Sequence, residues 1–235
     1  IRLDLNICRI WSVYLKDLDD KLRKHDPPLT FDSSTVLTTV TTSGVVSTGS
    51  HGMKVGTSNL SEKVISFQIV TSDGKLHEFS DEIDPVEMSA ARISLLGIIY
   101  KLTFKVEPMF NMIEKDSFPN LSDYWKAKNL KNDVLTCDSI EILYWPFNTP
   151  GLQEKNDKLW VKTYKRTDKD VTESQLEVKA ASAFQSFGLK FGEHLYEYMA
   201  KHPECTPFMT NLLFNIGVNH ERERILQAPD AIHYQ

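Results

Sequence analysis

The chain has 235 residues and a mass of 26.9 kDa, with 41% hydrophobic and 25% charged residues, the composition of an ordinary folded protein. This composition excludes collagen-like, low-complexity and disordered classes. The net charge of −5 argues against a broad nucleic-acid or anionic-membrane surface, and the three cysteines are too few and too far apart for a cysteine zinc cage or a dense disulfide framework.

The two ends of the sequence predict a piece of a longer protein. The chain opens on Ile1 without a charged-then-apolar leader, and it ends at Gln235 without a capped helix or polar tail. No stretch reaches the roughly 18 apolar residues that a membrane span needs. Membrane association would therefore depend on segments outside this chain, and the sequence leaves the localisation open.

Residues 7–25 are predicted to form an amphipathic helix, because their apolar side chains recur at spacings of three and four. Pro27 and Pro28 are expected to end this helix. The character of the sequence then changes, since residues 33–50 carry no charge and consist mostly of Ser, Thr, Val and Gly.

A hairpin follows, with strands at 64–70 and 76–79 joined by a turn at 72–75. Asp84 and Pro85 predict the start of a helix that runs to about Ser94. Residues 98–106 alternate as a half-buried strand, and the side chains predicted to share its apolar face are Ile98, Tyr100, Leu102, Phe104 and Val106.

Pro108 is the predicted boundary between a first domain, 1–108, and a second domain, 109–235. The second domain is expected to contain antiparallel strands at 139–147 and 158–166, a long helix at 173–200 and a further helix from Thr206. Its charged run at 220–224 has the pattern of a solvated helix face. This mixed order of helices and strands predicts an α+β fold.

The segment 41–56 is the most informative part of the sequence, because it holds four of the ten glycines. Glycine lets the backbone approach a ligand and adopt positive φ, so that successive N–H groups can converge on an anion. Thr48 and Ser50 could add hydroxyl donors to a phosphate. A Gly-rich turn between two strands is an equally good interpretation, and the segment matches neither the Rossmann nor the Walker pattern.

His51 lies between small residues within this segment and could donate a hydrogen bond to a ligand or act as an acid or base. It could equally well only satisfy neighbouring backbone groups. The other histidines show no metal-ligand spacing, and the chain lacks the G-x-S-x-G pattern of a serine nucleophile. A metal site and a hydrolase are therefore both disfavoured. Cys137 and Cys205 lack a nearby partner motif and are interpreted as buried or incidental thiols.

Two stretches together resemble a known family. GVVSTGSHG at 44–52, followed by AARISLLGIIYKLTFKVEP at 90–108, is similar to the second half of the FAD-binding domain of vanillyl-alcohol-oxidase-type (PCMH-type) flavoproteins, closest to the sugar-1,4-lactone oxidases. The hairpin at 65–80 also fits. More weakly, SIEILYWPF at 139–147, KTYKRTD at 162–168 and DAIHYQ at 230–235 resemble the substrate, or cap, domain of the lactone oxidases.

The resemblance implies FAD as the cofactor and assigns residues to it by position. The implied cofactor-binding residues, acting largely through main-chain groups, are Thr41, Val46, Thr48, Gly49, Ser50, His51, Gly52, Gly56 and Ile98. The step 97–99 would pass close to the adenine-ribose side of FAD. The chain departs from the family pattern at Met53 and Lys54, where the family has a small residue and a further glycine.

The implied activity is the oxidation of a sugar lactone or polyol at a CH–OH carbon by hydride transfer to flavin, with oxygen or another electron acceptor. The resemblance assigns no catalytic residue within this chain, because the family's flavin-linking histidine would precede Ile1 and its substrate-orienting charges would mostly follow Gln235. The alternative is a truncated remnant that folds as a binding or interaction module without FAD.

Overall fold

The computed structural model describes residues 2–4, 7–56, 59–93, 95–126, 129–145, 157–172, 195, 197–217 and 221–233. The chain divides into two compact units. The first contains Ile1–Phe110 and Gln227–Gln235, and the second contains Asn111–Leu226. The division after Phe110 lies close to the predicted boundary at Pro108. The expected second domain, 109–235, differs at its end, because the last nine residues belong to the first unit.

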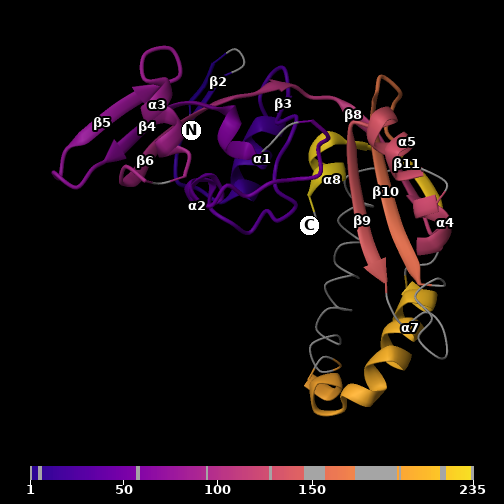
Figure 1. Cartoon of the computed structure of the whole chain (residues 1–235). Helices are drawn as coiled ribbons and strands as arrows, with labels where there is room; N and C mark the ends of the chain where they lie inside the picture. The colour runs from indigo at the N-terminus through magenta and orange to yellow at the C-terminus, as the bar shows by residue number, and fades with distance from the viewer. Residues whose placement is uncertain are drawn as a thin grey trace. The chain divides into compact units, whose positions relative to one another are not determined.

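The first unit is built on a five-stranded antiparallel sheet in the order β1-β2-β6-β4-β5 (Figure 1). The strands are β1 Arg2–Asp4, β2 Ile7–Trp11, β4 Val64–Val70, β5 Leu76–Ser80 and β6 Ile98–Lys105. Its helices are α1 Leu15–Arg23, α2 Thr42–Ser47, η1 Leu60–Lys63, α3 Pro85–Ala91 and α8 Ala228–Ile232. The short strands β3 Leu29–Thr30 and β7 Glu107–Pro108 form a separate ladder.

The predicted helix over 7–25 is correct only in its second part. Residues 7–11 form β2, in which Cys8 and Ile10 point into the core and pair with Phe104 and Leu102 of β6. The helix α1 begins only at Leu15. Spacings of three and four can coincide with alternation over five residues, and pairing with β6 decides this stretch in favour of a strand.

The buried face of β6 differs from the prediction at the start of the strand. Leu102, Phe104 and Val106 are buried as expected, but Ile98 is 76% exposed and Ile99 is buried in its place. The cause is an irregularity in the ladder with β4, where Gln68 pairs with Lys101 but Ile69 pairs with Ile99. Because this bulge adds one residue to β6, side chains before it point to the opposite face.

Helix α3 and the hairpin β4–β5 follow the sequence closely. Strand β4 has the predicted bounds, and Gly74 takes positive φ in the turn that leads to β5. Asp84 is the residue before α3, with Pro85 in the first turn, and the helix ends three residues before Ser94. Asp84 uses its carboxylate to accept from the backbone N–H of Ser80, at 3.3 Å.

The C-terminal helix α8 packs in the first unit through polar contacts with α1. The guanidinium of Arg23 donates to both carboxylate oxygens of Asp230, at 2.6 and 2.9 Å. The Nε2 atom of His233 lies 3.0 Å from a carboxylate oxygen of Asp19, and both residues are buried. These contacts explain why residues 227–233 belong to the first unit, although they follow the second unit in the sequence.

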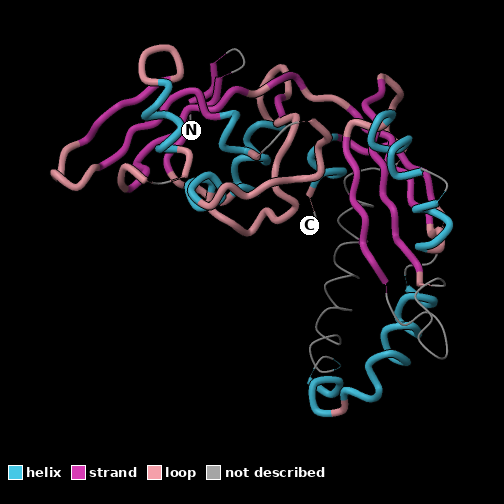
Figure 2. The backbone as a smooth tube through the Cα atoms, in the orientation of Figure 1, coloured by secondary structure: helices cyan, strands magenta, loops and turns pink. Residues whose placement is uncertain are grey.

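The second unit contains a four-stranded sheet in the order β11-β8-β10-β9. Figure 2 draws the strands in magenta and the helices in cyan. The strands are β8 Asn111–Ser117, β9 Ser139–Trp145, β10 Lys158–Thr167 and β11 Arg222–Gln227. The helices are α4 Leu121–Lys126, α5 Asn129–Thr136, η3 Pro203–Cys205 and α7 Thr206–Gly217. The predicted strand at 158–166 and the helix from Thr206 are confirmed, and the strand at 139–147 is confirmed as far as Trp145, where the described residues end. The helix at 173–200 lies mostly outside the described residues.

The charged run at 220–224 is not a helix face. Glu221 precedes β11, and residues 222–224 are the first residues of this strand, which lies beside β8 in the sheet. Helix α4 packs on one face of this sheet, where its Tyr124 contacts Leu159 and Val161 of β10. The mixed content of both units confirms the predicted α+β class.

Candidate functional site

The Gly-rich segment 41–56 begins as the short helix α2, which neither sequence interpretation predicted. Thr41 precedes the helix, and its side-chain oxygen accepts from the backbone N–H of Gly44, at 3.2 Å. Val46 is fully buried, and its carbonyl oxygen accepts from the Ser61 hydroxyl, at 2.8 Å. The Val46 side chain therefore belongs to the core and is not available to a ligand.

Two hydroxyl groups, those of Thr48 and Ser50, directly follow the end of α2. The exposed Thr48 donates its hydroxyl hydrogen to the carbonyl of Gly44, at 2.9 Å, and its oxygen lies 3.0 Å from the Ser50 hydroxyl. Gly49, between them, has φ +62°, a left-handed conformation that a side chain would strain. The hydroxyls of Thr48 and Ser50 consequently lie on the same side of this turn.

His51 is exposed, and its Nδ1 lies 3.3 Å from the carbonyl oxygen of Gly52, which accepts from the ring when Nδ1 is protonated. This contact supports the interpretation in which the ring satisfies a neighbouring backbone group. The backbone of His51 forms an isolated antiparallel bridge with Asn59. Gly56, four residues beyond Gly52, is exposed and has φ +73°.

Buried polar atoms without partners surround this segment. Among the described residues, the hydroxyls of Ser33 and Ser34 and the Oδ1 of Asn59 are buried and have no hydrogen-bond partner. The backbone carbonyl of Ser34 also lies against Gly52. Buried polar groups in folded proteins are nearly always satisfied, so these atoms are candidates to bind a hydrogen-bonding group that the described residues do not supply.

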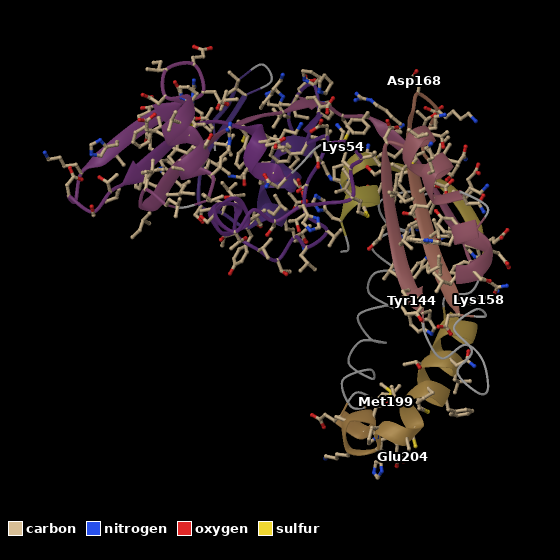
Figure 3. All side chains as sticks on the ribbon, in the orientation of Figure 1. Lys54, Tyr144, Lys158, Asp168, Met199 and Glu204 are labelled. Carbon is tan, nitrogen blue, oxygen red and sulfur yellow. The ribbon has the colours of Figure 1, made fainter. Side chains whose placement is uncertain are left out.

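Lys54 is engaged within the protein. Its ammonium and that of Lys63 both contact the carboxylate of Asp32, the second at 2.8 Å, and Figure 3 labels Lys54 in the first unit. Burial raises the pKa of Asp32, but hydrogen bonds and charge from Lys54 and Lys63 outweigh it, so that the pKa lies below its ordinary value. A cavity of about 200 Å³ adjoins Asp32 and Lys63 and also touches Lys105.

Ile98 lies away from this segment in the chain, at the start of β6, where it pairs with Val70. Gly97, just before it, has φ +154°, and an added Cβ would lie 2.2 Å from the Val70 carbonyl oxygen. The structure thus gathers residues 41–52 around α2 and its following turn. Among the described residues, no hydrogen bond or ion pair joins Ile98 to them.

Sequence reasoning missed a buried charged cluster on the sheet of the second unit. Glu114 is 2% exposed, and its carboxylate contacts Arg224 at 2.9 Å and Lys162 at 3.7 Å. Arg222 bridges Glu114 and Asp116, at 3.5 and 3.3 Å. Two acidic residues at alternating positions of β8 were the available signal, because charged side chains on the same face of a strand require partners when buried.

Within the described parts of the chain, no group of three His, Cys, Asp or Glu side chains is placed to hold a metal ion. No described helix is long and apolar enough to cross a bilayer.

The mouse L-gulonolactone oxidase is 30% identical over 138 residues, which are 57% of this chain and 30% of the relative. The D-arabinono-1,4-lactone oxidase of Saccharomyces cerevisiae is 28% identical over 184 residues, 73% of this chain and 31% of the relative. The chain is similar to the sugar-lactone oxidases. These matches confirm the predicted resemblance, although the chain spans only about a third of the length of these relatives.

A solved structure of cholesterol oxidase from B. sterolicum shares the fold. It matches 97% of this chain and 46% of its own, with a TM-score of 0.61 and 16% identity. At this identity the likeness concerns the fold alone. No family model matches the chain.

Proposed function

We propose that this chain is part of an FAD-dependent oxidoreductase that oxidises the CH–OH group of a sugar-derived lactone or polyol. The observation that carries the proposal is the similarity to an L-gulonolactone oxidase and a D-arabinono-1,4-lactone oxidase, over 57% and 73% of the chain. In this proposal the first unit contributes to the cofactor site, as the second half of a PCMH-type domain. The second unit contributes to the substrate domain.

The residues of the Gly-rich segment fit a dinucleotide cofactor. Thr48 and Ser50 offer adjacent hydroxyls, and Gly49 leaves the turn without a side chain. The side-chain amide oxygen of Asn59 is an unsatisfied acceptor that could bind a cofactor hydroxyl. The proposed cofactor-binding residues remain Thr41, Val46, Thr48, Gly49, Ser50, His51, Gly52, Gly56 and Ile98. Val46 would act only through its main chain, because its side chain is in the core.

Bound FAD would supply the acceptor for a hydride and would pass its electrons to oxygen or another acceptor. The work of this chain's residues is to bind and orient. The Ser50 hydroxyl would donate a hydrogen bond to a phosphate oxygen, and Thr48 would hold the turn through its bond to the Gly44 carbonyl. The turn at Gly49 would let the backbone approach the phosphate. No side chain described here is proposed as the catalytic base.

A second candidate is a folded binding module that does not retain FAD. Two observations favour it. Lys54, which could otherwise reach a phosphate, is held by Asp32, and the close approach that Gly52 permits is used by the Ser34 carbonyl. Both groups thus serve contacts within the protein.

The test is an absorbance spectrum of the protein purified from its source, in search of flavin bands near ~450 nm, followed by acid precipitation to detect covalently held flavin. A Thr48→Ala, Ser50→Ala double variant is compared with Asp168→Asn, an exposed change in the other unit. The cofactor site is supported if the parent and Asp168→Asn retain flavin and the double variant retains less of it. A folded, full-length protein that binds no flavin leaves the binding module as the function.

A further inference from the structure

We propose that a cavity in the second unit, between the end of β8 and the helices α4 and α5, binds a small, neutral, polyhydroxylated ring. The cavity has a volume of about 260 Å³. Its lining includes Ser117, Phe118, Tyr124, Asn129, Asp133 and Glu221. Naming a sugar lactone as the ligand rests on the proposed function, but the cavity itself does not.

The polar groups of the cavity are prearranged. The hydroxyl of Tyr124 donates to a carboxylate oxygen of Asp133, at 2.7 Å. Burial raises the pKa of Tyr124, and its bond to Asp133 raises it further, so the phenol stays neutral. The contact fixes the orientation of Asp133 and leaves its second oxygen as an acceptor.

Two side chains in the cavity have open hydrogen-bonding capacity. Among the described residues, none forms a hydrogen bond or ion pair with the side chains of Asn129 or Glu221. The amide of Asn129 can donate to a lactone carbonyl, and the carboxylates of Glu221 and Asp133 can each accept from ring hydroxyls. A ring with several hydroxyls and one carbonyl matches this set of donors and acceptors.

An aromatic face completes the site. The ring of Phe118 stacks on Trp160, with centroids 6.1 Å apart and planes at 27°. Trp160 is held in turn, because its indole N–H donates to Asp116, at 3.2 Å. A ring fixed in this way offers a flat apolar surface to the C–H face of a sugar ring.

The charges of the cavity select among ligands. Asp133 and Glu221 are both acidic, and the lining residues that the structure describes include no Lys, Arg or His. A carboxylate or phosphate ligand would be repelled, whereas a neutral polyol would gain charge-assisted hydrogen bonds. The described residues do not place three metal-ligating side chains together here, so the site is not proposed to act through a cation.

The experiment measures binding of D-arabinono-1,4-lactone to the flavin-free chain by saturation-transfer NMR and calorimetry. The variants are Asp133→Asn and Glu221→Gln, singly and combined, and Phe118→Leu. Asp133→Asn retains an acceptor for the Tyr124 hydroxyl, and Glu221 is exposed, so neither change should prevent folding. Asp168→Asn is the matched control. This exposed acid follows the C-terminal end of β10, whereas Ser117 of the cavity pairs with Val161 near the N-terminal end of the strand (Figure 3).

The expected result is saturation transfer to the lactone in the parent, with affinity weakened about tenfold or more in the combined variant. Asp168→Asn should bind as the parent does, and the open-chain arabinonate anion should bind more weakly than the lactone. Circular dichroism checks that each variant is folded.

The proposal is overturned if the parent shows no transfer to the lactone, if the cavity variants bind as the parent does, or if Asp168→Asn loses binding equally. Flavin retention in the parent is measured separately. Flavin without lactone binding removes this cavity and leaves the proposed function, whereas lactone binding without flavin removes the oxidoreductase and leaves the cavity.

Discussion

The carbonyl oxygen of Ser34 lies against Gly52 so closely that a Cβ added at Gly52 would be 1.8 Å from it. Backbone from two distant parts of the first unit meets at this point, and the absence of a side chain makes the contact feasible. The contact also fixes where the Gly-rich segment runs relative to residues 33 and 34, whose hydroxyls are buried.

Gly52→Ala is therefore expected to destabilise the protein by about 3 kcal/mol, because the new methyl group overlaps backbone that must shift. Gly56→Ala is the matched control. It also strains a positive φ but meets nothing within 4 Å, so about 1 kcal/mol is expected. Urea unfolding at neutral pH measures both, and equal losses would contradict the assigned contact.

Asp32 should make stability depend on acidity. Its pKa is lowered in the folded protein, so it contributes stability above the ordinary carboxylate pKa of about 3.9. That contribution is lost as the pH falls through the lower folded value. Asp32→Asn is expected to be less stable than the parent at neutral pH, and the difference should shrink at acid pH. Unfolding curves at neutral pH and at about pH 3 test this; a difference that grows on acidification would contradict it.

Glu114 should be critical for the second unit. Glu114→Ala removes the carboxylate that contacts Arg224 and Lys162, both of which are largely buried. Breaking a buried ion pair typically costs about 3–5 kcal/mol, and we expect a loss of this order. Denaturant unfolding compares it with Asp168→Asn, which should change stability by less than about 0.5 kcal/mol. A similarly small loss in Glu114→Ala would show that the cluster contributes little.

The cysteines should differ in reactivity. Burial raises the pKa of Cys8 to about 12, and the side chain is fully buried, so almost no thiolate is present and reagent cannot reach it. Cys137 and Cys205 are only partly buried. Iodoacetamide followed by peptide mass spectrometry should label Cys205 or Cys137 before Cys8, with Cys8 modified only after unfolding. Early labelling of Cys8 would place it outside the core.

The sequence by itself determined the elements whose patterns are local. Alternation identifies β4, β9 and β10, the turn at Gly74 joins the hairpin, and Asp84 with Pro85 starts α3, because each depends on residues close in the chain. The glycines of 41–56 also pointed to a segment with unusual backbone. The positive φ of Gly49 and the close approach at Gly52 agree with that reasoning.

The tertiary structure alone decided which partners these elements meet. Pairing with β6 makes residues 7–11 a strand, and the bulge opposite Gln68 and Ile69 buries Ile99 and exposes Ile98. Arg222 and Arg224 belong to a strand because Glu114 and Asp116 lie on its neighbour, and Lys54 is held by Asp32. These outcomes depend on contacts between residues far apart in the chain, and a local periodicity carries no information about register or about distant charges.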